Sequence, residues 1–435
     1  SPRVRFSPFP RLELQPPQTL GHRRNPAAIR NITRHPEMPR KRRTEAPPRG
    51  GKKRKPEKAA AIPHQIARTG SCDTEPPLVY LVVGHDVTRP AYSIVKVNPF
   101  FPRRRAPVPI PGHLARLESK HCMSFVAVRS RHGPWIVGVG GNAPIDYGPE
   151  TIVFDTRTHQ VIPGPKLLST KFRPILLPAG EKIYALTRDP AIKGEINFVP
   201  WFEVLDLSQA RVVSGRLVDC KWEQLPRPPC FPWELSPRHY IFPPVVWVRS
   251  FAAVSSCILV STDEQKGTHM FNLETEQWAK LDDKDLPFTG GAAPHGPLFL
   301  GFSTAAKKIT AYKITVCAAD SPSPSITAGC PSLSIVEFPM VDEAGEEVVS
   351  NGKFVSLGNH GFCSFRCRTD DLVLGTLEHT RELVTMRTYG TEDLSQDHLK
   401  SIRHVVISNQ LEQVYSVRDS LRGLSWPSLV DVISL

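Results

Sequence analysis

The sequence predicts an all-β fold, a β-propeller of repeated four-stranded sheets, behind a disordered basic N-terminal arm. Three observations predict it. One hairpin-like unit occurs twice, short apolar runs follow one another from residue 78 onward, and 44 prolines disfavour long helices in a chain of 435 residues. Hairpins of one design repeated along a chain are typical of propellers and arrays, and they direct attention to binding rather than catalysis.

The arm comprises residues 1–66 and is predicted to be disordered. It is rich in Pro, Arg and Lys, lacks hydrophobic periodicity, and holds 17 Lys and Arg against 4 Asp and Glu. Such a composition buries too little apolar surface to offset the entropy lost on ordering. The arm therefore accounts for the whole net charge of +13, and the rest of the chain is neutral. Residues 67–77 are expected to be a linker to the propeller at 78–435.

Two basic clusters in the arm resemble a bipartite nuclear import signal. The first is Arg40, Lys41, Arg42 and Arg43, and the second is Lys52, Lys53, Arg54 and Lys55. Flexible clusters of this size predict recognition by an importin and a nuclear location, with the cytoplasm as the alternative. The same charges would also suit a solubilising tail, or weak nonspecific binding of nucleic acid through its phosphates.

The beginning of the chain carries a separate expectation. The chain starts at Ser1, and its first methionine opens the segment MPRKRR at 38–43, which resembles a translation start. The hypothesis is that residues 1–37 are a gene-model artefact or a translated leader. N-terminal mass spectrometry of the native protein tests it, because peptides from residues 1–37 would contradict it.

From residue 78 onward, short runs of apolar or alternating residues predict strands. They are punctuated by Gly, Pro, Asp or Ser, and short helical turns are expected only at 392–402 and 418–424. The predicted strands are 78–83, 92–97, 125–128, 135–139, 183–186, 202–205, 251–254, 257–260, 298–300, 309–314 and 333–338.

The repeated unit predicts how these strands group into blades. Its copies read TIVFDTRTHQVIPGP at 151–165 and GTHMFNLETEQWAKL at 267–281, each an apolar strand, an Asp or Asn, a Thr-bearing turn and a second strand. Six blades fit residues 78–435, while five or seven also fit because 341–380 has no clear pattern. Outer hairpins are expected to begin near Tyr92, Ile152, Phe202, His269, Ile309 and Val384.

These units resemble kelch repeats, in which a strand ending in two glycines precedes a Tyr-bearing strand, a turn and a Trp-bearing strand. In the first unit, Gly140 and Gly141 end a strand and Phe154 stands in the Tyr place, whereas the pair Gly290-Gly291 follows its hairpin. The resemblance implies a kelch-like β-propeller in which the tryptophans fill the gaps between blades. The residues with repeat-structural roles are then Gly140, Gly141, Phe154, Asp155, Trp222, Phe271 and Trp278.

A more specific resemblance is to an uncharacterised kelch-like family expanded in grasses. It is carried by FVAVRSRHGPWIVGVGG at 125–141, PWFEV at 200–204 and KDLPF at 284–288, and it covers most of residues 78–435. It implies a plant protein with a propeller fold. It implies no activity, because members of the family are generally unassigned.

The sequence predicts no catalytic residues, no metal and no cofactor. Some kelch propellers are copper oxidases, but the 15 histidines here are scattered without a His-x-His or His-His pair. No nucleophile elbow, zinc-protease helix or phosphate-loop motif occurs, and His295 and Asp189 have no recognisable partners. Cys363 and Cys367 lack the second pair that a zinc site needs. No apolar run reaches about 18 residues, so no membrane association is expected.

The sequence therefore predicts a non-enzymatic scaffold that binds unknown protein partners in the nucleus. Loops on a rigid scaffold are where binding residues concentrate, and the Pro-rich segments 223–244 and 318–332 on the propeller rim are the candidates. One alternative is a chromatin- or RNA-associated factor that uses the basic arm. A second alternative is an enzyme whose site is assembled from distant blades in the propeller channel.

Overall fold

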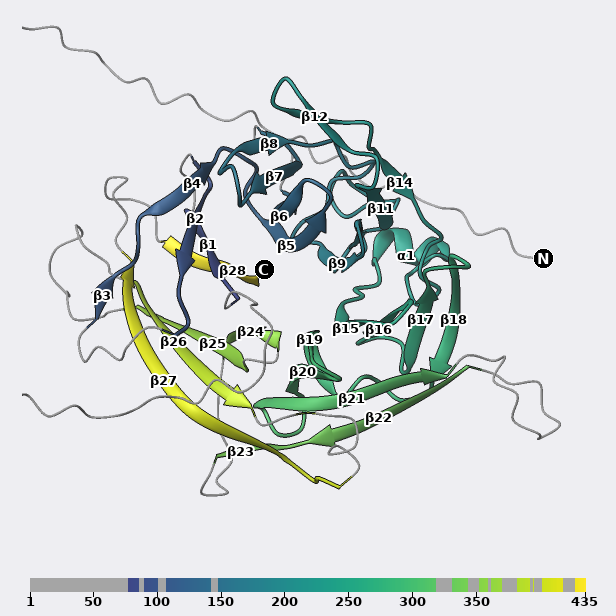
Figure 1. Cartoon of the computed structure of the whole chain (residues 1–435). Coiled ribbons are helices and arrows are strands. Elements are labelled where there is room, and N and C mark those ends of the chain that lie inside the picture. The colour runs from purple at the N-terminus through teal and green to yellow at the C-terminus, as the bar shows by residue number, and fades with distance from the viewer. Residues whose placement is uncertain are drawn as a thin grey trace, which may run out of the picture. The chain divides into compact units, whose positions relative to one another are not determined.

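The strands form antiparallel groups of four that stand side by side around a central axis (Figure 1). The computed structural model describes residues 77–435 except 86–89, 101–106, 142–147, 318–330, 343–351, 359–360, 370–381, 392–393, 395–400 and 418–426. Contacts divide the chain into Ser1–Ser71 and Cys72–Leu435, and the described residues all belong to the second unit.

Each group of four strands is one blade, and its strands follow one another from the axis outward. A short parallel pairing, Ser250 with Gly290 and Phe251 with Gly291, joins the fourth and fifth blades into one eight-stranded sheet. Blade 1 contains β28 (Pro427–Ser434), β1 (Val79–His85), β2 (Tyr92–Val97) and β4 (His113–Leu117). Blade 2 contains β5 (Met123–Ser130), β6 (Gly133–Gly140), β7 (Thr151–Asp155) and β8 (Val161–Pro163). Blade 3 contains β9 (Ile175–Ala179), β10 (Lys182–Leu186), β11 (Phe202–Asp206) and β14 (Trp222–Gln224).

The second half of the chain continues the pattern. Blade 4 contains β15 (Val248–Val254), β16 (Cys257–Thr262), β17 (Thr268–Asn272) and β18 (Gln277–Asp282). Blade 5 contains β19 (Phe288–His295), β20 (Leu298–Ser303), β21 (Ile309–Cys317) and β22 (Ser332–Phe338). Blade 6 contains β24 (Lys353–Ser356), β25 (Phe362–Thr369), β26 (Glu382–Thr391) and β27 (Val405–Val417).

The predicted all-β propeller is therefore confirmed, and the predicted strands are present. Each expected start of an outer hairpin lies within two residues of the first residue of the third strand of a blade. These third strands are β2, β7, β11, β17, β21 and β26. Both copies of the repeated unit form the outer hairpin of a blade, β7–β8 and β17–β18. The predicted turns at 392–402 and 418–424 fall largely outside the described residues.

The ring closes because the last strand joins the first blade. Strand β28 pairs with β1 along its length, with Val79 opposite Ser434 and His85 opposite Pro427. The backbone N–H of Leu435 donates a hydrogen bond of 3.2 Å to the carbonyl of Leu78, so the end of β28 lies beside the start of β1. Residues from opposite ends of the described chain thus complete one sheet, and β28 covers the edge of β1 that would otherwise be unpaired.

The hydrophobic core consists of six clusters in the described residues, and each cluster joins two adjacent blades. Leu81 of blade 1 shares a cluster with Phe365 of blade 6, which shows that the packing continues across the closure. Strands β1 and β16 are buried along their whole length because neighbouring blades cover both faces. One blade cannot bury both of its faces alone, so blade stability depends on its neighbours.

Short elements supplement the blades. Strands β3 (Val108–Pro109) and β23 (Met340–Asp342) pair in parallel with β27, and β12 (Arg211–Val213) forms an outlying hairpin with β13 (Arg216–Val218). The helix α1 (Pro237–Ile241) lies in the connection between blades 3 and 4, within the segment 223–244 that was expected to be a Pro-rich loop. Among the described residues, no helix combines the length and the apolar character needed to cross a membrane.

Candidate functional site

A cavity of about 820 Å³ occupies the axis of the propeller. The inner strands of the blades supply residues to its wall. Phe125 of β5, Ile175 of β9, Phe251 of β15, Lys353 of β24 and Asp431 of β28 all line it. The cavity is therefore a product of ring closure, because strands far apart in the sequence supply its wall.

Two loops place charged groups at the cavity. Arg173 belongs to the connection from β8 to β9, and Arg188 and Asp189 belong to the connection from β10 to β11. With Lys353 and Asp431, the lining holds three cationic and two anionic side chains. Arg173 lies over the ring of Phe172 with 5.5 Å from its Cζ to the ring centroid, and Arg188 lies over Phe251 at 6.0 Å.

These charges affect one another. Burial lowers the pKa of Arg188, the positive charge of Arg173 lowers it further, and Asp431 and Asp189 oppose this effect. Burial raises the pKa of Asp431, against the opposing effects of Lys353, two backbone N–H groups and Arg188. Burial also raises the pKa of Asp189, and Arg188 opposes that rise. Each shift has desolvation as its largest cause, as expected for charges withdrawn from bulk water.

The position of Arg173 is set by the backbone on both sides of it. Its φ is +44°, and its N–H donates a hydrogen bond of 2.9 Å to the carbonyl of Cys122. The preceding N–H, of Phe172, donates to Oδ1 of Asn197 at 2.8 Å. A left-handed backbone conformation is uncommon for a residue other than glycine. It persists where contacts with the surrounding structure hold the residue in place.

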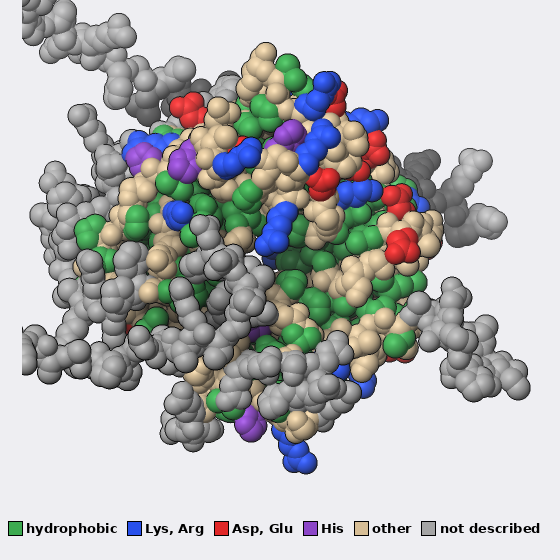
Figure 2. All heavy atoms as spheres, in the orientation of Figure 1, with side chains coloured by type: hydrophobic (Ala, Val, Ile, Leu, Met, Phe, Trp, Pro, Cys, Tyr) green, Lys and Arg blue, Asp and Glu red, His purple; other side chains and the backbone are tan. Residues whose placement is uncertain are grey.

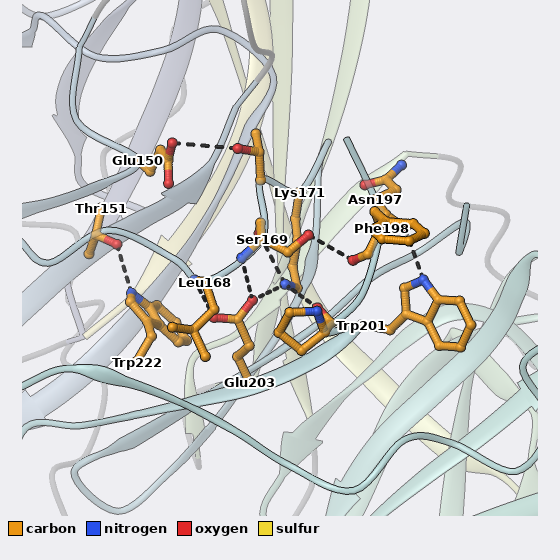
Figure 3. Close-up of polar contacts among 12 residues, drawn as sticks. Glu150, Thr151, Leu168, Ser169, Lys171, Asn197, Phe198, Trp201, Glu203 and Trp222 are labelled. Atoms are coloured by element: carbon orange, nitrogen blue, oxygen red, sulfur yellow. Dashed lines mark hydrogen bonds and ion pairs between the residues drawn. The ribbon is translucent and has the colours of Figure 1, made fainter. Parts of the chain in front are cut away.

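A buried ion pair anchors the same connection (Figure 3). The side chains of Lys171 and Glu203 are both fully buried and in direct contact, and Lys171 Nζ also donates to the carbonyls of Ser169 at 3.1 Å and Pro200 at 2.9 Å. Glu203 accepts from the backbone N–H groups of Leu168 at 2.8 Å and Ser169 at 3.2 Å. Burial lowers the pKa of Lys171, and the carboxylate of Glu203 opposes this effect.

The network ties three parts of blade 3 together. Glu203 belongs to β11, Lys171 to the connection at 164–174, and Pro200 to the connection at 187–201. A second tie is the Oγ of Ser169, which donates to the carbonyl of Phe198 at 2.7 Å. Both connections that carry the cavity arginines are therefore fixed to one strand and to each other.

The connection at 225–247 lies beside these two and exposes many apolar side chains. Trp233 packs edge-on against Trp201, and Lys193 Nζ donates to the carbonyl of Tyr240 at 3.3 Å. In the described part of the chain, half of the twelve large apolar side chains that are exposed belong to this connection. We call them the aromatic patch, which consists of Trp233, Tyr240, Ile241, Phe242, Val245 and Trp247.

The aromatic patch adjoins the cavity. Trp247 belongs to both, and Arg188 accepts a hydrogen bond of 2.9 Å at its carbonyl from the N–H of Val248. Arg227, in the same connection, lies over the ring of Trp233 at 3.4 Å from the centroid. Figure 2 shows hydrophobic side chains on one side of a hollow near the middle of the molecule, with Lys and Arg side chains beside it.

The residues with predicted repeat roles lie in the blades and their interfaces. Gly140 ends β6, and Gly140 and Gly141 have φ of +99° and +125°. Phe154 is the fourth residue of β7 and is buried, and Asp155 accepts from the N–H groups of Arg157 and Thr158 in the following turn.

Trp222, Phe271 and Trp278 lie between adjacent blades. Trp222 of blade 3 donates from Nε1 to Thr151 Oγ1 of blade 2 at 3.0 Å. Trp278 lies opposite Phe271 in blade 4, and its ring is 5.6 Å from that of Phe202 in blade 3.

Two other candidates from the sequence are a histidine and a pair of cysteines. His295 lies between the hydroxyl of Ser356, 3.0 Å from Nδ1, and the hydroxyl of Thr391, 3.3 Å from Nε2. On β25, Cys367 is exposed, whereas Cys363 is buried with its Sγ 3.2 Å from the hydroxyl of Thr388. The described residues contain no group of three His, Cys, Asp or Glu side chains placed to hold a metal ion.

Several predicted positions lie outside the described residues. These are both clusters of the predicted import signal, Arg40 to Arg43 and Lys52 to Lys55, and nearly all of the candidate loop 318–332. The other candidate loop, 223–244, contains most of the aromatic patch. Sequence reasoning did not identify Arg173, Lys353 or Asp431 as site residues, because no local pattern links them.

The comparisons with known proteins concern the body of the chain. Residues 76–411 match the family described as "Protein of unknown function (DUF1668)". No curated protein matches the chain. Among solved structures, it is similar to the WD40 domain of SCAP from fission yeast, with 11% identity, a TM-score of 0.28, and coverage of 76% of this chain and 72% of that one. It is also similar to apo AztD from Citrobacter koseri, with 10% identity, a TM-score of 0.29, and coverage of 82% and 98%.

Proposed function

The chain belongs to the DUF1668 family, whose description assigns no function, and we propose that it is a non-enzymatic scaffold that binds a protein partner through the aromatic patch. The observation that supports this proposal is the concentration of exposed apolar side chains in one connection. Four of them, from Tyr240 to Phe242 and Val245, are more than half exposed. Large exposed apolar groups rimmed by polar residues mark interaction surfaces, and aromatic residues dominate the energy of such surfaces.

The rigidity of the support also favours binding at this surface. Buried Trp201 donates from Nε1 to the carbonyls of Ala191 at 3.1 Å and Asn197 at 3.0 Å, and its ring supports Phe231 and Trp233. The patch is thus mounted on a packed base within blade 3. A partner that binds a preorganised surface loses less conformational entropy than one that must order a loop.

Proximity labelling with the tagged full chain tests the proposal. The patch variant combines Trp233→Ser, Tyr240→Ser, Ile241→Ser and Phe242→Ser, and the control combines Val212→Ser and Val213→Ser in the outlying β12 hairpin. We expect a set of labelled neighbours that the patch variant loses and the control retains. Identical neighbours for all three chains would contradict the proposal, provided that all three show the same cooperative unfolding.

A nuclear location is a separate part of the proposal. It is supported by the two basic clusters, Arg40 to Arg43 and Lys52 to Lys55, which an importin would read as a bipartite signal. Replacing the second cluster with alanines should shift a fluorescently tagged full chain toward the cytoplasm, whereas replacing Arg23 and Arg24 should not. An unchanged distribution would refute the import signal.

We also propose that the repeats are kelch-like and that the protein comes from a plant. The support is the order of two glycines ending β6, Phe154 on β7, and a tryptophan on the outer strand of two blades. Sequences of further family members would test the repeat assignment. A glycine pair should recur at the ends of their second strands, and its consistent absence would refute a kelch relationship.

A further inference from the structure

The cavity holds more positive charge than its own groups neutralise. In the described part of the chain, the side chains of Arg173, Arg188 and Lys353 make no hydrogen bond or ion pair. The two guanidinium groups repel each other, and in addition to burial the charge of Arg173 accordingly lowers the pKa of the partly buried Arg188. Guanidinium groups left without partners in a concave site suit a carboxylate, which they can bind with two parallel hydrogen bonds.

The carboxylates in the cavity are already engaged elsewhere. Asp431 accepts from the N–H of Phe125 at 3.3 Å and from the N–H of Val432 at 3.0 Å. Asp189 Oδ1 is 3.5 Å from the amide nitrogen of Asn197. Both side chains weaken the positive field, but their hydrogen-bonding capacity is partly used by backbone and amide donors. One further carboxylate would balance the charge of the cavity.

The loops around the cavity are basic as well as apolar. Six basic and three acidic side chains belong to the connections 164–174, 187–201 and 225–247. Lys171 is left out of this count because Glu203 neutralises it. The basic side chains are Lys166, Arg173, Arg188, Lys193, Arg227 and Arg238. The three acidic side chains are Asp189, Glu195 and Glu234.

Resting on the proposed function, we propose that the partner presents an acidic, apolar peptide segment: its apolar side chains cover the aromatic patch, and one carboxylate enters the cavity between Arg173 and Arg188. Trp247 joins the two parts of this surface because it belongs to the patch and lines the cavity. A single extended segment would therefore contact both parts. The positive loops would attract it from a distance, and the apolar contacts would hold it.

Charge also distinguishes this occupant from two others. The N-terminal arm of the chain carries 17 basic and 4 acidic residues, so the positive loops would repel it. A nucleic acid would need phosphate contacts along an extended basic track. Here the acidic side chains of Asp431 and Asp189 line the cavity, and Ile241 and Val245 of the aromatic patch expose aliphatic groups. An acidic peptide fits both the charge and the apolar groups.

Selection from a phage-displayed library of random peptides, with the full chain as bait, tests the proposal. We expect selected peptides to be enriched in Asp or Glu and in Leu, Phe or Trp. Synthetic copies of these peptides, labelled for fluorescence anisotropy, should bind at least about tenfold more weakly to Arg188→Gln and to Arg173→Gln. The control Arg216→Gln, on the outlying hairpin, should bind them as tightly as the unaltered chain. All three variants should unfold at the denaturant concentration of the unaltered chain.

Each other outcome has a distinct meaning. Peptides that need the aromatic patch but contain no acidic residue, or that bind both arginine variants normally, would refute the carboxylate site and leave the scaffold intact. If no peptide is selected and proximity labelling shows no dependence on the patch, the scaffold proposal fails as well. Tighter peptide binding after deletion of residues 38–58 would show that the arm occupies the site, against the charge argument. Binding of a single-stranded RNA 20-mer that the Arg188→Gln change abolishes would assign the cavity to nucleic acid and overturn the peptide proposal.

Discussion

At the scale of single residues, the candidate site depends on a few side chains whose conformations the surrounding structure imposes. Arg173, Cys122 and Asn197 all have positive φ, and they lie together where three connections meet. Each such conformation costs on the order of 1–3 kcal/mol in a residue other than glycine. The hydrogen bonds of the Lys171–Glu203 network lie next to these positions and offset that cost.

The buried ion pair gives the first prediction. Lys171→Met should lower the free energy of unfolding by roughly 3–5 kcal/mol, because it leaves the carboxylate of Glu203 buried without its cation. Denaturant titration measures this loss. The exposed pair Lys221–Glu223, 3.2 Å apart with side chains 80% and 60% exposed, is the control, and Lys221→Met should cost less than about 1 kcal/mol.

The double change Lys171→Met with Glu203→Gln should restore part of the lost stability. It removes the unpaired charge, and the glutamine keeps an oxygen that can accept from the N–H groups of Leu168 and Ser169. If Lys171→Met unfolds at the same denaturant concentration as the unaltered chain, the pair does not anchor the connection.

His295 gives a prediction about pH. Burial lowers the pKa of His295 from 6.5 to about 4. Below pH 6.5, the imidazole of His295 therefore binds a proton in the unfolded chain but stays neutral in the folded chain. The free energy of unfolding should consequently fall as the pH drops from 6.5 toward 4. The shift corresponds to a loss of about 3 kcal/mol across this range.

The measurement is the free energy of unfolding at several pH values for the unaltered chain and for His295→Asn. The difference between the two should shrink as the pH falls, because the variant lacks the group that resists protonation. His404→Asn, which alters an exposed histidine, should keep the pH dependence of the unaltered chain. A constant difference between the His295 variant and the unaltered chain would contradict the assignment.

At the scale of elements, the end of strand β6 connects the repeat pattern to the candidate site. Gly140 has φ of +99°, and a Cβ at this position would lie 2.5 Å from the carbonyl oxygen of Lys171 and 2.6 Å from Cδ of Pro174. The N–H of Gly141 donates to that same carbonyl at 2.8 Å. The glycine pair therefore lets the connection 164–174 pass close to β6 on its way to the cavity.

This contact predicts that Gly140→Ala destabilises the fold by roughly 2–5 kcal/mol, since strain at positive φ adds to a clash with backbone. The matched control is Gly112→Ala, because a Cβ there would meet no atom within 4 Å. Denaturant titration of both variants measures the difference. Equal unfolding midpoints for the two variants would show that the close approach is not needed.

At the scale of the whole propeller unit, stability depends on closing the ring. Strand β28 supplies the inner edge of blade 1, and its Val432 and Ile433 are buried in the interfaces with blades 6 and 2. It also supplies Asp431 to the cavity. A chain without β28 would expose the edge of β1 and two hydrophobic interfaces, which favours aggregation.

The role of β28 is therefore predicted to depend on its presence and not on its position in the sequence. A chain truncated after Val417 should lose cooperative unfolding and aggregate. A permuted chain that carries residues 427–435 directly before residue 77, joined by a short turn, should unfold cooperatively as a monomer, because Leu435 already lies beside Leu78. Size-exclusion chromatography and denaturant titration compare the two chains. A truncated chain as stable as the full one would contradict the closure argument.

The sequence by itself determined the all-β class, the strands and the outer hairpins. These features follow from local patterns, because alternating apolar residues and turn residues act over a few positions. The segment 223–244 was also identified as a binding candidate from its composition, and the structure shows apolar side chains exposed there.

Only the tertiary structure decided where the cavity lies and which charges face it. Phe125, Arg173, Arg188, Lys353 and Asp431 come from five different stretches of the chain, and only ring closure brings them around one axis. The pairing of β28 with β1 and the burial of Lys171 against Glu203 likewise join residues that no local pattern relates. The physical reason is that blade packing is long-range, so neighbours across the ring are set by the whole fold and not by spacing along the sequence.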